Sequence, residues 1–393
     1  MRLQTQPDNS GALTSDASFN RPLICWPLGD YRELYSGLIE FMRSVLETDH
    51  VPFEFASDLK SRATRPRLKP FSDPGYRHLG PFLPKFDLYM DLYCPGYAYS
   101  PDFQLFFDTL STHQLGRLRL TGSGRTKSAM SWQAPLYNQF IADLRKQAVV
   151  CNTRKRFADW RRSADKQKDS IRELMVQLQS RRRRMLPLRV DLYYGTTAAV
   201  EADAMPRNCW GALSREAHAD DRFDSSDWVP PFETRARIDS ALAMQHREAF
   251  FENRKGSDAE LFSNLLAYIC KLETGGGHRA NHFHVLFLFD ARVVKLGDLD
   301  RLLSRVQDRW WRITGGLGFV FDSREHPGVE LLRSQGRWVM DPIDSRDTQR
   351  VAGLEQYLTA YFAKDDFTKD DGQMLRVKPT EKARTLTMTQ DPD

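Results

Sequence analysis

Two histidines, His282 and His284, stand inside one of the most apolar stretches of the sequence, NHFHVLFLFD at residues 281–290. In a β-strand alternate side chains point to the same face, so the two imidazoles would lie side by side, about 6.6 Å apart at a rise of ~3.3 Å per residue. Two rings at that spacing can converge on one cation, as metal ligands do. The alternative is a pair of hydrogen-bonded histidines at the end of a buried strand.

A carboxylate that could complete such a site precedes the histidines. The segment LLAYICKLET, residues 265–274, is predicted to be a strand or a helix that runs into one, and the GGGHRA behind it is typical of a turn. The two apolar segments would then form a β-hairpin that brings Glu273 beside His284. Two imidazoles and one carboxylate are three ligands for a divalent metal, and they leave positions open for substrate oxygens. A plain surface acid is the alternative for Glu273.

A second group of residues that could take part in a reaction follows about 70 residues later, in YLTAYFAK at residues 357–364. On a helix that turns by about 100° per residue, Tyr357, Tyr361 and Lys364 fall within about 60° of one another. A phenol is a suitable nucleophile toward phosphorus, a metal polarises the scissile phosphate, and a lysine offsets charge on the phosphoryl oxygens. The alternative is that both tyrosines are core residues of an amphipathic helix.

The elements around these residues predict an α+β domain. MLPLRVDLYY, at residues 185–194, alternates apolar and polar side chains, as a half-buried strand does. The other expected elements are a helix at 231–252, a helix at 296–313, short strands at 328–333 and 336–343, and a helix at 351–364. We expect an antiparallel central sheet with helices on one face, which would leave the other face to hold the histidines.

The N-terminal half is expected to be mostly helical, with an amphipathic helix at residues 31–47. The predicted division is a disordered tail at 1–20, an N-terminal region of unknown role at 21–130, a basic helical segment at 131–184, the α+β domain at 185–375 and a flexible tail at 376–393.

Basic residues concentrate towards the end of the helical segment. The run Arg181, Arg182, Arg183 and Arg184, with Arg189 beyond it, could track a phosphate backbone and would make binding depend on salt. A solvated helical face is the alternative for such a charge run.

Composition is that of a soluble globular protein, with 28% charged and 41% hydrophobic residues among 393. The five cysteines are far apart and form no CxxC pair, which favours a reducing compartment. The sequence has neither an apolar run of the ~20 residues needed to cross a membrane nor the apolar region of a signal peptide. We therefore expect a cytoplasmic protein without a membrane partner.

The motifs resemble those of a known group. The apolar-flanked HFH and the YxxxYxxK pattern look like motifs two and three of HUH endonucleases, which start rolling-circle DNA replication. The closer resemblance is to the YagK/YfjJ C-terminal family of inovirus and prophage replication proteins. It covers residues 185 to about 370 and is carried, in order, by LRVDLYY, KLETGGGHRANHFHVLFLFD, LGDLDRLLSRVQDRWW and YLTAYFAK.

The resemblance implies roles for the residues above. His282 and His284 would bind Mg²⁺ or Mn²⁺ with Glu273 as the third ligand. Tyr361 or Tyr357 would be the nucleophile, the two alternating between nicking and resealing, and Lys364 would be the base that positions the phosphate. Two departures from the family pattern are Ala360, where some phage relatives place a lysine, and the glycine-rich loop, which differs from the usual EKG-like turn.

The function expected from this resemblance is a replication initiator that nicks and rejoins single-stranded or hairpin origin DNA through a phosphotyrosine intermediate. The chain has no GxxxxGK[ST] motif for an ATP-driven helicase, so a host helicase is the expected partner. One alternative is a catalytically inactive DNA-binding regulator with the same fold. Another is a cupin-like metal oxidoreductase, but those proteins usually place a glutamate where Leu288 or Phe289 stands here.

Overall fold

The protein is described by a computed structural model. It places residues 24–25, 32–194 and 236–363, with gaps at 58–63, 91, 94–96, 117–128, 182, 238–239, 253, 255, 275–280 and 327, as well as residues 377–378 and 383–389. The expected tail at 1–20, Arg182 and Lys364 lie outside these described residues. No helix of the described part has the length and apolar character needed to span a bilayer.

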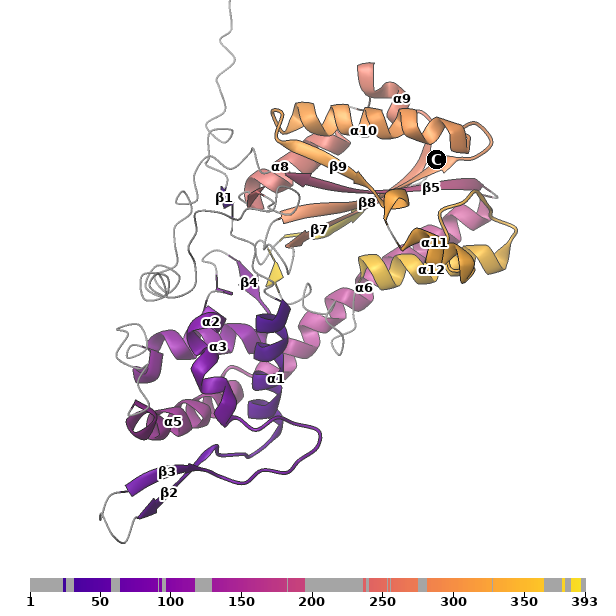
Figure 1. The fold of residues 1–393 in the computed structure, drawn as a ribbon. Coiled ribbons are helices and arrows are strands. Elements are labelled where there is room, and N and C mark those ends of the chain that lie inside the picture. The colour runs from indigo at the N-terminus through magenta and orange to yellow at the C-terminus, as the bar shows by residue number, and fades with distance from the viewer. Residues whose placement is uncertain are drawn as a thin grey trace, which may run out of the picture.

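The N-terminal half forms a helical lobe around an aromatic core, as expected (Figure 1). Phe86 lies at its centre, with its ring centroid 5.2 Å from that of Phe41, 5.4 Å from Phe106 and 5.3 Å from Phe140. The elements of this lobe are α1 (Arg32–Glu47), the hairpin β2 (Phe53–Ser57) and β3 (Thr64–Leu68), η2 (Gly80–Lys85), α2 (Phe86–Met90), β4 (Ala98–Tyr99), α3 (Pro101–Thr112) and α5 (Ala129–Val150).

One long helix, α6 (Thr153–Ser180), links this lobe to the rest of the chain (Figure 1). It follows α5 after Asn152, whose φ of 52° breaks the helical path. Its first part lies against α3 and α5. Its last part buries an apolar row against the sheet, formed by Ile171, Leu174, Met175 and Leu178.

The C-terminal half is built on a six-stranded sheet in which every described pair is antiparallel. The strand order is β10-β5-β8-β7-β12, and β9 also pairs with β5. The strands are β5 (Arg184–Tyr194), β7 (Leu265–Thr274), β8 (Asn281–Asp290), β9 (Gly318–Asp322), β10 (Ile343–Asp344) and β12 (Leu386–Met388). The antiparallel α+β architecture and the β7–β8 hairpin predicted from the sequence are thus confirmed.

Helices cover both faces of this sheet, so the expectation of helices on one face was wrong (Figure 1). The reason is that β8 is buried along its whole length, with Phe283, Val285, Phe287 and Phe289 on one face and the histidines, Leu286 and Leu288 on the other. The phenylalanine face packs on α8 (Ser240–Phe251), α9 (Ala259–Phe262) and α10 (Leu299–Ile313). The histidine face packs on α6 and α12 (Thr348–Phe362).

Three local predictions were also wrong. Residues 328–333 were expected as a strand, but residues 329–333 belong to the helix α11 (Val329–Ser334). Val329 is its only buried side chain, so no sheet face holds this segment in a strand. Of the strand expected at 336–343, only Ile343 pairs, with Met185 of β5. The segment expected as a flexible tail forms β11 (Val377–Lys378), which pairs with β4, and β12, which extends the sheet beyond β7.

Candidate metal centre and tyrosine pair

The sheet register sets four polar side chains on three neighbouring strands of the histidine face. Asp191 of β5 stands opposite His284 of β8, and Glu273 of β7 stands opposite His282. Glu273 does lie beside His284, as predicted, but diagonally across the two strands and not directly opposite it. Its Oε2 reaches across to Nε2 of His284 at 3.0 Å.

Glu273, His282 and His284 form a group that can hold a metal ion. One donor atom from each lies within 4.8 Å of the others, and the side chains are 3, 4 and 5% exposed. The Nε2 atoms of the two histidines are 3.2 Å apart. Two imidazole nitrogens and one carboxylate oxygen that converge in a buried space suit a divalent cation, which offsets the mutual repulsion of their lone pairs.

Asp191 orients this group from the other side, a role that the sequence did not reveal. Its Oδ1 lies 2.6 Å from Nδ1 of His284. A carboxylate that accepts the Nδ1 proton leaves the Nε2 lone pair directed at the metal position, which is the usual support for a metal-binding histidine. The alternating pattern of residues 185–194 was the available signal, because it places Asp191 on the polar face of the strand.

Asp191 and His284 shift each other's pKa values. Burial would raise the pKa of Asp191, but the adjacent His284 and Arg189 outweigh burial and lower that pKa to about 2. Burial would lower the pKa of His284, but the carboxylates of Glu273 and Asp191 outweigh it and raise that pKa. Two carboxylates therefore supply negative charge beside His284, and Arg189 offsets part of it.

Both predicted tyrosines reach this site from α12. The hydroxyl of Tyr361 lies 2.8 Å from Nδ1 and 3.3 Å from Nε2 of His284. The rings of Tyr357 and Tyr361 are stacked, with centroids 5.7 Å apart and planes 5° from parallel. Both tyrosine rings also pack against the apolar cluster of the histidine face, which is the core role considered as the alternative.

One guanidinium holds both phenols. Nη1 of Arg189 donates to the Tyr357 hydroxyl at 2.8 Å, and Nη2 donates to the Tyr361 hydroxyl. The Arg189 guanidinium carbon also lies 3.8 Å from the centroid of the Tyr361 ring. Burial raises the pKa of both tyrosines, and the positive charge of Arg189 opposes that rise. Arg189, expected only as part of a DNA-binding stripe, is thus a member of the site.

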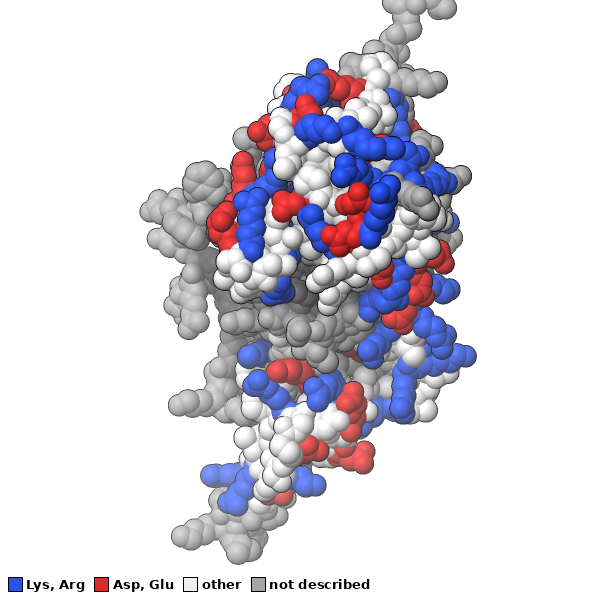
Figure 2. All heavy atoms as spheres, turned by 90° about the vertical axis from the view of Figure 1, so that its right-hand side faces the viewer, with Lys and Arg blue, Asp and Glu red and all other residues white. Residues whose placement is uncertain are grey.

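The rest of the basic run lies elsewhere. Arg184 begins β5, and seven residues of strand at ~3.3 Å each separate it from Asp191, or about 23 Å. It pairs with Asp344 at 3.2 Å, and Arg181 is exposed at the end of α6. Figure 2 shows Lys and Arg mixed with Asp and Glu over one side of the molecule rather than a patch of one sign.

A buried lysine lies in the same cross-strand row as Asp191 and His284. Lys271 of β7 stands opposite His284, is buried, and donates from Nζ to Oε1 of Gln167 on α6 at 2.6 Å. Sequence reasoning missed Lys271, because its proximity to the histidines depends on the register of the hairpin.

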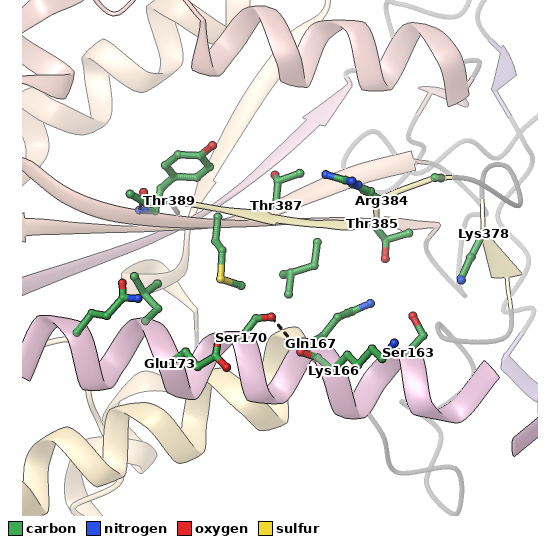
Figure 3. A pocket seen from close by; sticks show the side chains of 16 residues that line it. Ser163, Lys166, Gln167, Ser170, Glu173, Lys378, Arg384, Thr385, Thr387 and Thr389 are labelled. Carbon is green, nitrogen blue, oxygen red and sulfur yellow. Dashed lines mark hydrogen bonds between the residues drawn. The ribbon is translucent and has the colours of Figure 1, made fainter. Parts of the chain in front are cut away.

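Gln167 also lines a groove of about 680 Å³ between α6 and the β12 segment (Figure 3). Most of the side chains in this groove are polar, and its charged members are Lys166, Glu173, Lys378 and Arg384. Nζ of Lys378 lies over the ring of Trp160, 4.3 Å from its centroid. Three cations against one carboxylate make this groove suited to anionic groups.

No protein-family model, no curated protein and no solved structure matches this chain.

Proposed function

We propose that this protein is a metal-dependent enzyme that nicks and rejoins single-stranded DNA through a phosphotyrosine intermediate, as a rolling-circle replication initiator does. The observation that carries the proposal is the position of the Tyr361 hydroxyl, 3.3 Å from Nε2 of His284, the nitrogen directed at the metal position, and 2.8 Å from Nδ1 of the same ring. A nucleophile for phosphorus and a site for a phosphate-polarising metal are thus adjacent, on elements 77 residues apart.

His282, His284 and Glu273 would hold Mg²⁺ or Mn²⁺. Three protein ligands leave coordination positions for phosphate oxygens, and the bound ion would supply charge neutralisation of the scissile phosphate. Asp191 keeps His284 in the tautomer and orientation that this requires.

The chain's own residues account for the exchange of bonds. The Tyr361 oxygen bonds to phosphorus, the bond from phosphorus to the 3′ oxygen breaks, and that oxygen takes up the proton that the phenol gives up. The reverse reaction uses the free 3′ hydroxyl to break the phosphotyrosine bond, so rejoining needs no nucleotide cofactor. Arg189 contacts the phenol oxygen and can stabilise negative charge that develops there.

Tyr357 is suited to a second transfer of the same kind. Its ring is stacked on Tyr361, and its hydroxyl is held by the same guanidinium, but no described contact links that hydroxyl to the histidines. We therefore assign the first attack to Tyr361 and the second to Tyr357. Lysine 364, which lies outside the described residues, keeps its expected role of positioning the phosphate.

The origin strand would also need contacts away from the scissile phosphate. The groove between α6 and β12 offers Lys166, Lys378 and Arg384 to flanking phosphates. Unwinding of duplex DNA would depend on a host helicase. The cupin-like alternative is disfavoured, because the strands that carry the histidines belong to a single antiparallel sheet with helices on both faces rather than to a jelly roll.

The test is incubation of the protein with labelled single-stranded DNA from its own element and Mn²⁺, followed by a denaturing gel. A protease-sensitive adduct that is lost in Tyr361→Phe supports the proposal. Tyr76→Phe is the matched control, since that phenol contacts Glu47 in the N-terminal lobe, and it should leave the adduct unchanged. Metal and DNA binding without any adduct would favour the inactive DNA-binding regulator.

A further inference from the structure

Three aromatic rings form a row that leads from the metal site to the edge of the sheet. The row begins at His282, whose ring is stacked on Tyr193 of β5 with centroids 5.1 Å apart and planes at 25°. Tyr193 is stacked in turn on Phe319 of β9, at 5.3 Å and 25°. The register explains the row, because Tyr193 stands opposite Phe319 and next to His282 on the same face of the sheet.

The outer end of the row is accessible. Phe319 is 36% exposed, whereas Tyr193 is 7% and His282 4% exposed. Among the described strands, β9 pairs only with β5, so the ring face of Phe319 that points away from Tyr193 lies at the sheet edge. Phe319 belongs to neither described apolar cluster of the sheet, whereas the neighbouring Val320 packs on the phenylalanine face.

We propose that Phe319, backed by Tyr193, is a stacking platform for one unpaired nucleobase of the bound strand. This inference rests on the proposed function and adds a specific subsite to it. Two strand spacings of ~4.8 Å place Phe319 about 10 Å from His282. The base that reaches Phe319 would belong to the nucleotide whose phosphate lies at the metal site or to the adjacent nucleotide of the strand. The base of either nucleotide can span that distance.

A base fits this position better than another apolar group. The platform is a flat ring in line with two further stacked rings, and aromatic side chains stack on bases of single-stranded nucleic acid with little preference for sequence. In a duplex both faces of a base are already covered by its neighbours. The platform therefore favours single-stranded over double-stranded DNA at the site of cleavage.

The test measures binding of the full-length protein to a fluorescent single-stranded oligonucleotide by anisotropy. Phe319→Ala should weaken binding about 5- to 150-fold, the range for loss of one stacked base, and Phe319→Trp should restore it. Phe319→Leu keeps the apolar contact with Tyr193 but lacks the π face, so it should weaken binding as well. Trp311→Ala is the control, because Trp311 is 54% exposed but belongs to α10 on the other side of the sheet.

Abasic oligonucleotides locate the subsite. Removal of one particular base near the nick should weaken binding to the wild type and have no further effect on Phe319→Leu. Equal affinity of the wild type and Phe319→Leu, or additive losses at every abasic position, would overturn the inference while leaving tyrosine-dependent nicking intact. Failure of the wild type to bind single-stranded DNA and to form an adduct would instead refute the proposed function, and the platform with it.

Discussion

The carboxylate of Asp191 lies 2.6 Å from Nδ1 of His284, although 93 residues separate them in the sequence. The contact crosses from β5 to β8 at a position where the two residues stand directly opposite each other. Through this contact β5 supports the candidate metal centre, although β5 supplies none of its three potential ligands. It also connects the site to Arg189, which lies two residues earlier on the same face and contacts Asp191 at 3.2 Å.

Loss of this carboxylate should weaken metal binding. We expect Asp191→Asn to reduce the affinity for Mn²⁺ by about 10- to 100-fold, because His284 would lose the group that fixes its tautomer. Isothermal titration calorimetry without DNA measures this directly. Asp290→Asn is the control, since Asp290 pairs with Arg292 at the far end of β8. Equal Mn²⁺ affinities for Asp191→Asn and the wild type would show that the contact has no part in metal binding.

Arg189 should matter for the reaction more than for metal binding. Arg189→Ala removes the donor to both phenols, and we expect the rate of adduct formation to fall about 10²- to 10³-fold, as for loss of one charge-stabilising donor. Arg189→Lys should rescue only part of the rate, because one ammonium cannot reproduce the planar fork that reaches both hydroxyls.

Arg184→Ala is the control and should leave the rate at saturating DNA unchanged, since Arg184 is an exposed residue of the same strand. Quenched time courses on denaturing gels give the rates. An unaltered rate in Arg189→Ala would remove Arg189 from the mechanism.

The position of α12 depends on its apolar face. Leu358 is fully buried against the histidine face of the sheet, between the two tyrosines in sequence. Leu358→Ala should lower the free energy of unfolding by about 2–5 kcal/mol through loss of burial and creation of a cavity. Chemical denaturation measures the change. Leu331→Ala, at a side chain that is 60% exposed, should change it by no more than about 0.5 kcal/mol.

Acid should destabilise the sheet domain through His246. Burial lowers the pKa of His246 to about 4, whereas an unfolded histidine titrates near 6.5. The unfolded chain therefore binds this proton first, so stability that is complete above pH 6.5 is lost as the pH falls towards 4, by about 3 kcal/mol in all.

Denaturation at several pH values between 7 and 4 tests this, with His246→Gln and the exposed His326→Gln compared to the wild type. The pH dependence should become shallower in His246→Gln alone. The same slope in all three proteins would contradict the assignment to His246.

We expect the arginine run at residues 181–184 to affect the affinity for DNA and not the rate of adduct formation. Reversal of charge at Arg181 to Arg184 should flatten the dependence of DNA affinity on salt, because each lost phosphate contact lowers the slope. The rate of adduct formation at saturating DNA should stay the same, since Arg184 lies about 23 Å from Asp191 along β5. An unchanged salt slope would favour the solvated helical face as the role of this run.

Sequence pattern by itself determined the parts of this protein that have a local cause. Alternation along residues 281–290 placed both histidines on one face, the glycine-rich turn predicted the hairpin with Glu273, and helical periodicity put Tyr357 and Tyr361 on one side of α12. Each of these depends on spacing within a single strand, hairpin or helix.

Tertiary structure decided the rest. The contacts of Asp191, Arg189 and Lys271 follow from the register of β5, β8 and β7 and from the packing of α12 and α6 over these strands. The pairing of β12 with β7 and the covering of both sheet faces likewise depend on contacts between distant segments. Such contacts form because whole apolar faces of distant segments are buried against one another. The free energy of that burial depends on the assembled fold and cannot be assigned to a single stretch of sequence.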